Sequence, residues 1–227
     1  MKLSEIYQTP DDSWDEENED GIVELPHTAQ NIVKNLRTNK QHKYLGSGSY
    51  AYVGTNDDEN FGDVHRVASV DDGGSMYLQY LANHPDIADN PFFPHVRKVE
   101  KANDTQVSIV ERLLPFKTEA VYSNGPLIRA IWKRYFNITV EEAFHEYGGS
   151  FQHAIPYVLR KALIHNNTKE IKDEMLIDAI HKLVAIAEEL GDVEYDIHQG
   201  NTMWRMAGYQ PQLVFTDPLV FTDPLVY

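Results

Sequence analysis

The chain has 227 residues, and its 42% of hydrophobic residues are enough for the core of one domain or of two small lobes that share a cleft. It contains no cysteine, which excludes disulfides, thiolate zinc sites and a cysteine nucleophile. The formal net charge of -15 disfavours binding to nucleic acid or to anionic membranes, and it favours basic partners. No apolar run approaches the roughly 20 residues of a membrane helix, and no signal-peptide pattern is present, so we expect a cytoplasmic protein.

Residues 11–20, DDSWDEENED, hold seven acidic side chains in ten positions. Such a run of like charges is typical of a solvated segment, so we assign residues 1–22 to an acidic N-terminal arm. Two interpretations of this arm stay open. It is either a segment with no fold of its own or a docking surface for a protein with a basic surface.

Residues 23–115 predict a five-stranded antiparallel sheet with one helix inserted among its strands. Short alternating segments separated by turn residues are typical of strands joined in hairpins. Residues 75–84 show helical spacing and stop before a proline, and residues 32–36 indicate one short helix ahead of the strands. The strands are predicted on both sides of a glycine turn within 43–53, and over 63–70, 95–102 and 105–114.

From about residue 120 the apolar period becomes that of helices, so residues 116–227 are assigned to a mostly helical half. Two strand-like segments, 201–206 and 213–217, predict a β-hairpin after the longest helix. Together the two halves predict an α+β fold. The helices are expected over 126–137, 139–148, 150–166 and 171–190. In the last of these, one apolar stripe contains Leu176, Ile180, Leu183, Val184, Ala187 and Leu190.

The turn in LGSGSYAYV contains Gly46 and Gly48, which have no side chain to keep backbone N–H groups away from a phosphate. With Ser47 and Ser49 this turn could form a phosphate-binding loop, and Val53 on the next strand would then press on an adenine ring. The alternative is a purely structural hairpin, because G-x-G turns are common in hairpins.

The segment YDIHQGNTMWR carries the strongest chemical signal, together with the strand end VFTD that follows it. Phosphoryl transfer needs a carboxylate that orients or deprotonates the attacking hydroxyl, and oxygen ligands that hold magnesium on the nucleotide phosphates. Asp196 fits the first role, and Asn201 and Asp217 fit the second. An Asp and an Asn five positions apart, with an Asp closing the next hairpin, have the spacing of a kinase site. The alternative is a loop in which these side chains cap their own backbone.

In these motifs the chain resembles the protein-kinase-like fold, and most closely the early protein kinases of T7-like podoviruses. The similar segments are LGSGSYAY, HRVASV, YDIHQGNTM and TDPLVF, spread over about residues 40–222. The resemblance implies a minimal two-lobed fold that uses ATP and Mg²⁺ to phosphorylate Ser or Thr of host proteins, particularly of the transcription and RNA-processing machinery, in the host cytoplasm. It also implies that Ser69, Glu111 and Leu113 line the nucleotide site.

The chain departs from the kinase pattern on the third strand. The lysine that binds the α- and β-phosphates would fall at Ser69, which is short and neutral, and its usual glutamate partner is replaced by Tyr77. Arg66 lies three positions away, so strand alternation is expected to turn it to the opposite face. Lys43, ahead of the glycine turn, is an alternative cation. His198 in the catalytic loop could contact the γ-phosphate or cap its own loop.

Three hypotheses therefore stay open. The first is an ATP- and Mg²⁺-dependent protein kinase of phage type, and losing one phosphate contact, at about 2–4 kcal/mol, would weaken it without abolishing catalysis. The second is a pseudokinase, a kinase-fold protein that binds and inhibits a host protein with little or no turnover. The third and least favoured is a small-molecule phosphotransferase.

The tail spells FTDPLV twice, at 215–220 and at 221–226. Asp217 is expected to be the metal ligand because it closes the predicted hairpin, whereas Asp223 lies roughly 20 Å farther along an extended chain. The second copy is interpreted as a short duplication or a tail that packs along an edge. The alternative is a competing metal aspartate.

Overall fold

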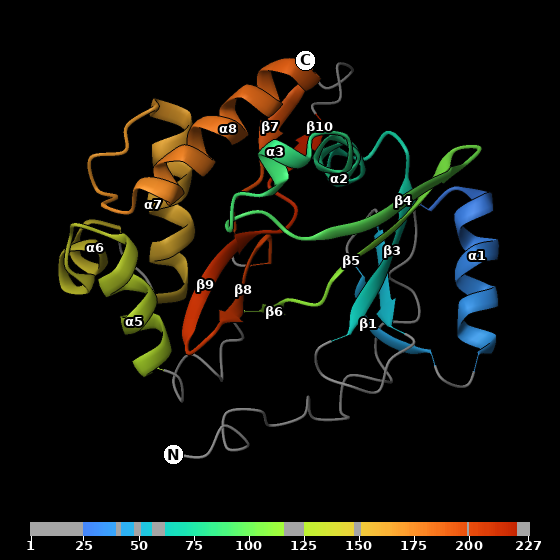
Figure 1. Cartoon of the computed structure of the whole chain (residues 1–227), viewed down its shortest axis with the longest axis horizontal. Coiled ribbons are helices and arrows are strands. Elements are labelled where there is room, and N and C mark those ends of the chain that lie inside the picture. Colours follow the sequence, from blue (N-terminus) through green and yellow to red (C-terminus); the bar gives the residue numbers. More distant parts are fainter. Residues whose placement is uncertain are drawn as a thin grey trace.

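The computed structural model describes residues 25–39, 42–47, 51–55, 62–115, 125–147, 151–198 and 200–221. These residues form the predicted α+β fold, with a five-stranded antiparallel sheet in the first half of the chain and most of the helices in the second (Figure 1). The acidic segment 11–20 lies outside the described residues.

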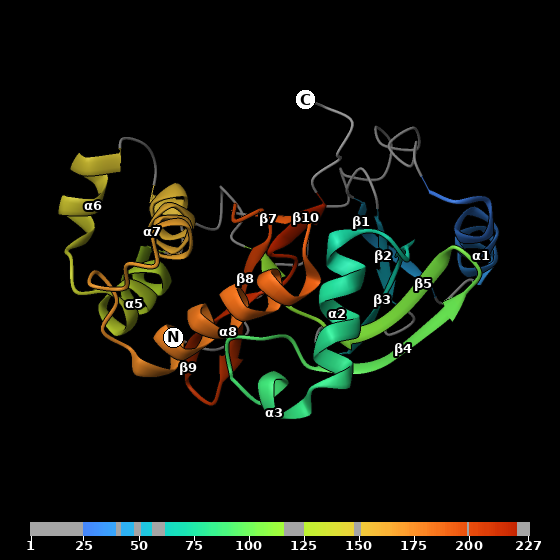
Figure 2. The ribbon, with the colours of Figure 1, turned by 90° about the horizontal axis from the view of Figure 1, so that it is seen from above.

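The five predicted strands are confirmed to within a few residues: β1 (Lys43–Ser47), β2 (Ala51–Thr55), β3 (Asp63–Ser69), β4 (Val96–Ala102) and β5 (Thr105–Glu111). Their order is β1-β2-β3-β5-β4 and all neighbours are antiparallel. Helix α1 (His27–Thr38) covers one face of the sheet, where its Ala29 and Val33 pack with Tyr52 and Val67. Because side chains alternate along β3, Arg66 lies on the other face, toward helix α2 (Gly73–Asn83). Figure 2 shows α2 between the sheet and α8 (Glu174–Leu190).

Helix α2 begins two residues earlier than the sequence predicts, at Gly73 rather than at Ser75. The Asp72 side chain accepts a hydrogen bond from the Ser75 N–H and caps the helix, so two glycines, which are poor helix formers, are held in its first turn. The short helix α3 (Pro85–Ala88) follows, with its proline in the first turn, where proline is tolerated. The Asp72 cap and the two glycines therefore allow the first turn of α2 to pack close to the rest of the chain.

Two small sheets complete the fold and bring the last third of the chain together. They are built from β6 (Leu114–Pro115), β7 (Val193–Tyr195), β8 (Thr202–Ala207), β9 (Gln210–Phe215) and β10 (Leu219–Phe221). β8 and β9 form the predicted hairpin, with β6 beside β8. The antiparallel pairing of β7 with β10 was not predicted. Because β7 ends just before Asp196 and β10 starts just after Asp217, this pairing brings the two acids to one end of the same ladder.

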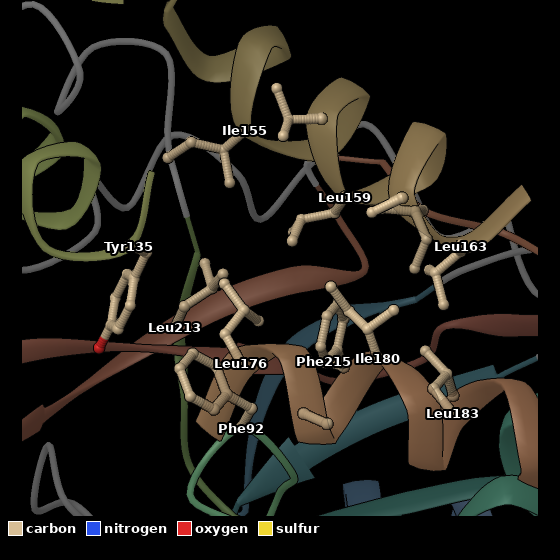
Figure 3. Close-up of a cluster of buried hydrophobic side chains, with 14 of the residues drawn as sticks. Phe92, Tyr135, Ile155, Leu159, Leu163, Leu176, Ile180, Leu183, Leu213 and Phe215 are labelled. Atoms are coloured by element: carbon tan, nitrogen blue, oxygen red, sulfur yellow. The ribbon is translucent and has the colours of Figure 1, made fainter. Parts of the chain in front are cut away.

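The predicted helices of the second half are confirmed as α5 (Gly125–Tyr135), α6 (Val140–Tyr147), α7 (Phe151–His165) and α8. Asp173 caps α8 by accepting a hydrogen bond from the Leu176 N–H. The predicted stripe of α8 faces the core, and Ala179 and Ile186 are buried with it. The side chains labelled in Figure 3 show α7, α8 and β9 sharing this core: Phe92, Tyr135, Ile155, Leu159, Leu163, Leu176, Ile180, Leu183, Leu213 and Phe215.

Residues 222–227, with Asp223 and most of the second FTDPLV copy, lie outside the described residues. The first copy supplies the end of β9, Asp217 and the start of β10. Over the ranges that the structure describes, no helix has both the length and the apolar character needed to span a membrane.

Candidate active site

Backbone hydrogen bonds brace the predicted catalytic loop against the predicted metal aspartate. The Asp196 N–H donates to the Pro218 carbonyl oxygen at 2.9 Å, and the Thr216 N–H donates to the Asn201 carbonyl oxygen at 3.0 Å. These bonds lie on both sides of Asp217. The structure therefore brings together the three residues that the sequence proposed for the chemistry.

The side chains of Asp196 and Asn201 contact each other directly. The Asn201 Nδ2 donates to the Asp196 carboxylate oxygen Oδ2 at 2.8 Å and to its backbone carbonyl oxygen at 3.0 Å. With the N–H₂ used in this way, the amide oxygen is the atom of Asn201 that could bind a cation. The Asp196 side chain is 43% exposed, so a substrate can reach it.

His198 takes one of the two roles that the sequence left open, because it caps its own loop. Its Nδ1 accepts a hydrogen bond from the Gly200 N–H at 2.9 Å, which caps the loop and leaves the proton of a neutral ring on Nε2. That Nε2 lies 3.5 Å from the Asp196 carboxylate. A Cβ at Gly200 would lie 2.8 Å from the imidazole ring, so a larger residue there would displace His198 from this position. His198 therefore helps to orient the Asp196 carboxylate.

Asp217 has one carboxylate oxygen in an ion pair and the other without a partner. Its Oδ2 accepts from Arg66 at 3.1 Å, whereas Oδ1 is buried and has no hydrogen-bond partner among the described residues. Burial raises the pKa of Asp217 to about 6; the negative charges of Asp72 and Asp196 act in the same direction, and Arg66 opposes them.

The expectation that Arg66 points away from the site is wrong. Its guanidinium binds Asp217 at 3.1 Å, Asp72 at 2.5 Å and the Ser75 hydroxyl at 3.0 Å. Ser69 and Arg66 do lie on opposite faces, but the face that carries Arg66 is the one toward the acids. Ser69 instead accepts a hydrogen bond from the Asp71 N–H at 3.3 Å in the turn after β3.

Arg66 is a buried cation that two carboxylates keep charged. Only 8% of its surface is exposed. Burial alone would lower its pKa, but the neighbouring Asp217 and Asp72 outweigh burial and the pKa is raised. The candidate site therefore contains a positive charge beside Asp217, supplied by an arginine from the middle of β3.

A buried polar network that the sequence did not reveal holds Arg66 in place. Ser75, which accepts from the guanidinium, also offers its backbone carbonyl to the Gln106 Nε2 at 2.8 Å, and that nitrogen donates to the Ser108 hydroxyl at 3.0 Å. All three side chains are buried on the α2 side of the sheet. Buried polar residues in an otherwise apolar strand, such as Gln106 and Ser108 in TQVSIVE, are the signal that could have revealed it.

Tyr77 occupies the place in α2 where the resemblance to kinases implies a glutamate. Its hydroxyl donates to the Phe215 carbonyl oxygen at 3.1 Å, two residues before Asp217. Burial raises the pKa of Tyr77 well above its usual value, and the charge of Asp217 adds to the shift. Tyr77 therefore acts as a neutral donor that fixes α2 against the end of β9.

Gly74 lets the first turn of α2 lie directly against the acid and the arginine. A Cβ at this position would overlap the Asp217 Oδ1 and the Arg66 Nη2. We expect Gly74→Ala to lower the free energy of unfolding by about 1–3 kcal/mol through overpacking. The control is Gly46→Ala, where the added Cβ meets no atom within 4 Å and the cost should stay below about 0.5 kcal/mol. Urea unfolding of both variants tests this, and equal stabilities would contradict the packing described.

The remaining predicted nucleotide contacts have mixed outcomes. Gly46 lies in β1 opposite Val53, and Val53 lies opposite Arg66 in the β2–β3 ladder, so the side chains of Val53 and Arg66 share the α2 face. Gly48 and Ser49 lie outside the described residues, and Ser47 is described only as the end of β1.

Three further residues expected near the nucleotide lie as follows. Leu113 is half-buried in the connection between β5 and β6. The Glu111 carboxylate is bonded to Arg205 and to the His95 N–H, so this side chain has a structural role at the end of β5. Lys43 lies opposite Thr55, at the end of the β1–β2 ladder away from the glycine turn.

The raised pKa of Asp217 predicts a pH dependence of stability with a definite sign. The folded state keeps the proton up to about pH 6, whereas an unfolded aspartate releases it near 3.8. The contribution of Asp217 to the free energy of unfolding is therefore fully present at low pH and decreases by about 1–3 kcal/mol as the pH rises from 4 to 6. Urea unfolding of the wild type and of Asp217→Asn between pH 4 and 7 should show their difference falling over this window. A difference that grows with pH would show that the ion pair with Arg66 outweighs burial.

The donor set fits a magnesium ion. Magnesium prefers oxygen ligands, commonly one or two carboxylates with substrate phosphates. Asp217 offers an Oδ1 without a hydrogen-bond partner among the described residues, and the amide oxygen of Asn201 is not used in the bonds to Asp196. In the part of the chain that the structure describes, no group of three or more His, Asp or Glu side chains could hold a metal, so a purely protein-bound centre is not indicated there.

No protein-family model matches the chain, and no curated protein resembles it closely enough in sequence to count as a relative. The function must therefore be inferred from the geometry of the site and from the motifs of the sequence.

Proposed function

We propose that the chain is an ATP- and Mg²⁺-dependent protein kinase of phage type, with the sheet half and the helical half as the lobes of a reduced kinase-like fold. The observation that carries the proposal is the meeting of Asp196, Asn201 and Asp217 beside one buried arginine. Following the resemblance of the motifs, the expected acceptors are Ser or Thr side chains of host proteins.

In this proposal Asn201 and Asp217 hold magnesium, which supplies neutralisation and orientation of the nucleotide phosphates when bound. The backbone hydrogen bond from Thr216 to Asn201 helps to keep the two ligands at a fixed separation. Fixed ligands reduce the reorganisation that the site needs when charge develops on the transferring group.

Asp196 is the group that receives the substrate proton. Asn201 fixes its Oδ2, and the exposed edge of the carboxylate is open to a hydroxyl. As the hydroxyl oxygen bonds to the γ-phosphorus, its proton passes to Asp196, and ADP leaves with the electron pair of the broken bond to the β–γ bridging oxygen. A positioned base of this kind contributes about 10²–10⁴ in rate.

Arg66 supplies the positive charge that the sequence seemed to lack. An arginine guanidinium binds phosphate oxygens well and stays charged at every relevant pH, and here a phosphate would share it with Asp72 and Asp217. Removing one such contact from a phosphoryl-transfer site costs about 2–4 kcal/mol. The kinase hypothesis therefore no longer depends on Ser69 or Lys43.

One observation favours the second candidate, a kinase-fold protein that binds a host protein with little turnover. Arg66 is already held by Asp72 and Asp217, so a nucleotide phosphate has to compete with two carboxylates for it. If the two carboxylates keep Arg66, the site would bind nucleotide poorly, and the chain would act only by binding a host protein.

The experiment that separates the two candidates uses ATP labelled on its γ-phosphate. The purified chain is incubated with this ATP, magnesium and host lysate, beside Asp196→Ala. Labelling of lysate proteins that requires magnesium and is lost in Asp196→Ala supports the kinase. No labelling by the wild type, with retention of one lysate protein on the immobilised chain, supports the binding protein.

A further inference from the structure

Away from the acid cluster, another buried charged side chain joins the sheet half to the C-terminal hairpin. Arg205 of β8 forms an ion pair through Nη1 with the Glu111 Oε1 at the end of β5. Its Nη2 donates to the carbonyl oxygen of Pro91 at 2.6 Å and lies 3.4 Å from that of Phe93. Only 14% of the Arg205 side chain and 13% of the Glu111 side chain are exposed. We call this set of bonds the Arg205 latch.

Both oxygens of the Glu111 carboxylate are engaged. Oε1 also accepts from the His95 N–H at 2.8 Å, and Oε2 lies 3.5 Å from the His95 Nδ1. The backbone N–H of Glu111 donates to the His95 carbonyl oxygen at 3.0 Å, and that of Arg112 donates to the Gly62 carbonyl oxygen at 3.2 Å. The end of β5 is thus fixed by its side chain and by its backbone at once.

The latch connects the strands that carry the two sides of the site. β8 begins immediately after Asn201, and Arg205 lies on that strand. Glu111 pairs with Asp63 in the β3–β5 ladder, and β3 carries Arg66. The loop whose carbonyl groups bind Arg205 also contains Phe92. The Phe92 carbonyl oxygen accepts a hydrogen bond from the Phe215 N–H at 2.9 Å, at the end of β9. A shift of β5 relative to β8 would therefore change how Arg66 meets Asp217.

We propose that Arg205 is a positioning residue that sets the distance between the sheet and the hairpin, and thereby the reach of Arg66 to the nucleotide phosphates. The effect on phosphates rests on the proposed function, whereas the latch itself does not. Arginine is required because its planar fork can serve a carboxylate and two carbonyl oxygens at once, which one lysine ammonium does not reproduce.

The test compares Arg205→Met, Arg205→Lys and the milder Glu111→Gln with the wild type. Hydrogen exchange followed by mass spectrometry reports on residues 105–113, where the amides of Glu111 and Arg112 lie. We expect exchange there to rise at least tenfold in Arg205→Met and by less in the other two, with α8 unchanged. The KM for ATP should rise about tenfold or more and kcat should fall with it, because both depend on the reach of Arg66, while the KM for the protein acceptor changes less than threefold. The control is Arg97→Met, which removes an exposed arginine–carboxylate pair with Asp63 in the same sheet and should change neither quantity.

Hydrogen exchange and the KM for ATP test separate parts of the proposal. Unchanged exchange over residues 105–113 in all three variants would overturn the latch, whatever the activity. Increased exchange with an unchanged KM for ATP would overturn the positioning role. A wild type without ATP turnover would overturn the proposed function and the effect on phosphates, and hydrogen exchange alone would then decide whether the latch exists. If Arg205→Met does not fold, Arg205→Lys and Glu111→Gln carry both readouts.

Discussion

Replacing Arg66 by methionine is expected to lower the free energy of unfolding by about 3–5 kcal/mol. The substitution fills a similar volume but leaves Asp72 and Asp217 close together without their shared cation. The same change should lower the rate of phosphoryl transfer by about 10²–10³, because a buried positive charge next to the phosphates is lost. Urea unfolding measures the first effect, and single-turnover transfer at saturating ATP measures the second.

The matched comparison for Arg66→Met lies on the same strand. Ser69→Ala should leave stability within about 0.5 kcal/mol, because its hydroxyl bonds within the turn at the end of β3. Ser69→Lys should not raise activity, because its side chain leaves β3 on the face opposite Arg66. A gain of activity in Ser69→Lys would show that the nucleotide phosphates contact the face of β3 that carries residue 69. Full activity in Arg66→Met would show that the guanidinium has no part in transfer.

Replacing Asp196 by asparagine is expected to lower kcat by about 10²–10⁴ with little change in stability or in the KM for ATP. The new amide keeps the shape of the side chain but does not take the substrate proton. Because Asp196 is 43% exposed and is not the residue that pairs with Arg66, the fold does not depend on its charge.

The control for Asp196→Asn is Glu194→Gln, two residues earlier on β7, where the carboxylate is exposed. This variant changes the local charge by the same amount and should keep kcat within about threefold. Steady-state kinetics and thermal unfolding of both variants provide the comparison. Equal losses in the two variants would mean that local charge, and not a base at residue 196, governs the rate.

Most of the longer elements of the fold could be predicted because they depend on a local period. The helix over 171–190 and the hairpins of the sheet show their apolar spacing without tertiary information. The β7–β10 pair could not be predicted in this way. Its strands have three residues each, and they pair across the catalytic loop and the whole β8–β9 hairpin, so no local pattern specifies the register.

The acids of the site could be predicted from spacing, but the cation could not. Asp196, Asn201 and Asp217 lie close together in sequence, on a loop and a hairpin. This limits how far apart they can lie in the folded chain. Arg66 lies 151 residues from Asp217, and which face of β3 meets the acids depends on where α1 and α2 pack. Alternation along the strand predicts that Arg66 and Ser69 lie on opposite faces of the sheet. It does not predict which of these faces lies toward the acids.

The most direct test of this account is the binding of ATP measured by titration calorimetry with and without magnesium, on the wild type and on Asp217→Asn. The account predicts binding by the wild type that strengthens at least tenfold when magnesium is present, and loss of that enhancement in Asp217→Asn with the fold intact. Binding of the same strength with and without the metal, or an enhancement that survives in Asp217→Asn, would contradict a metal–nucleotide site at this cluster.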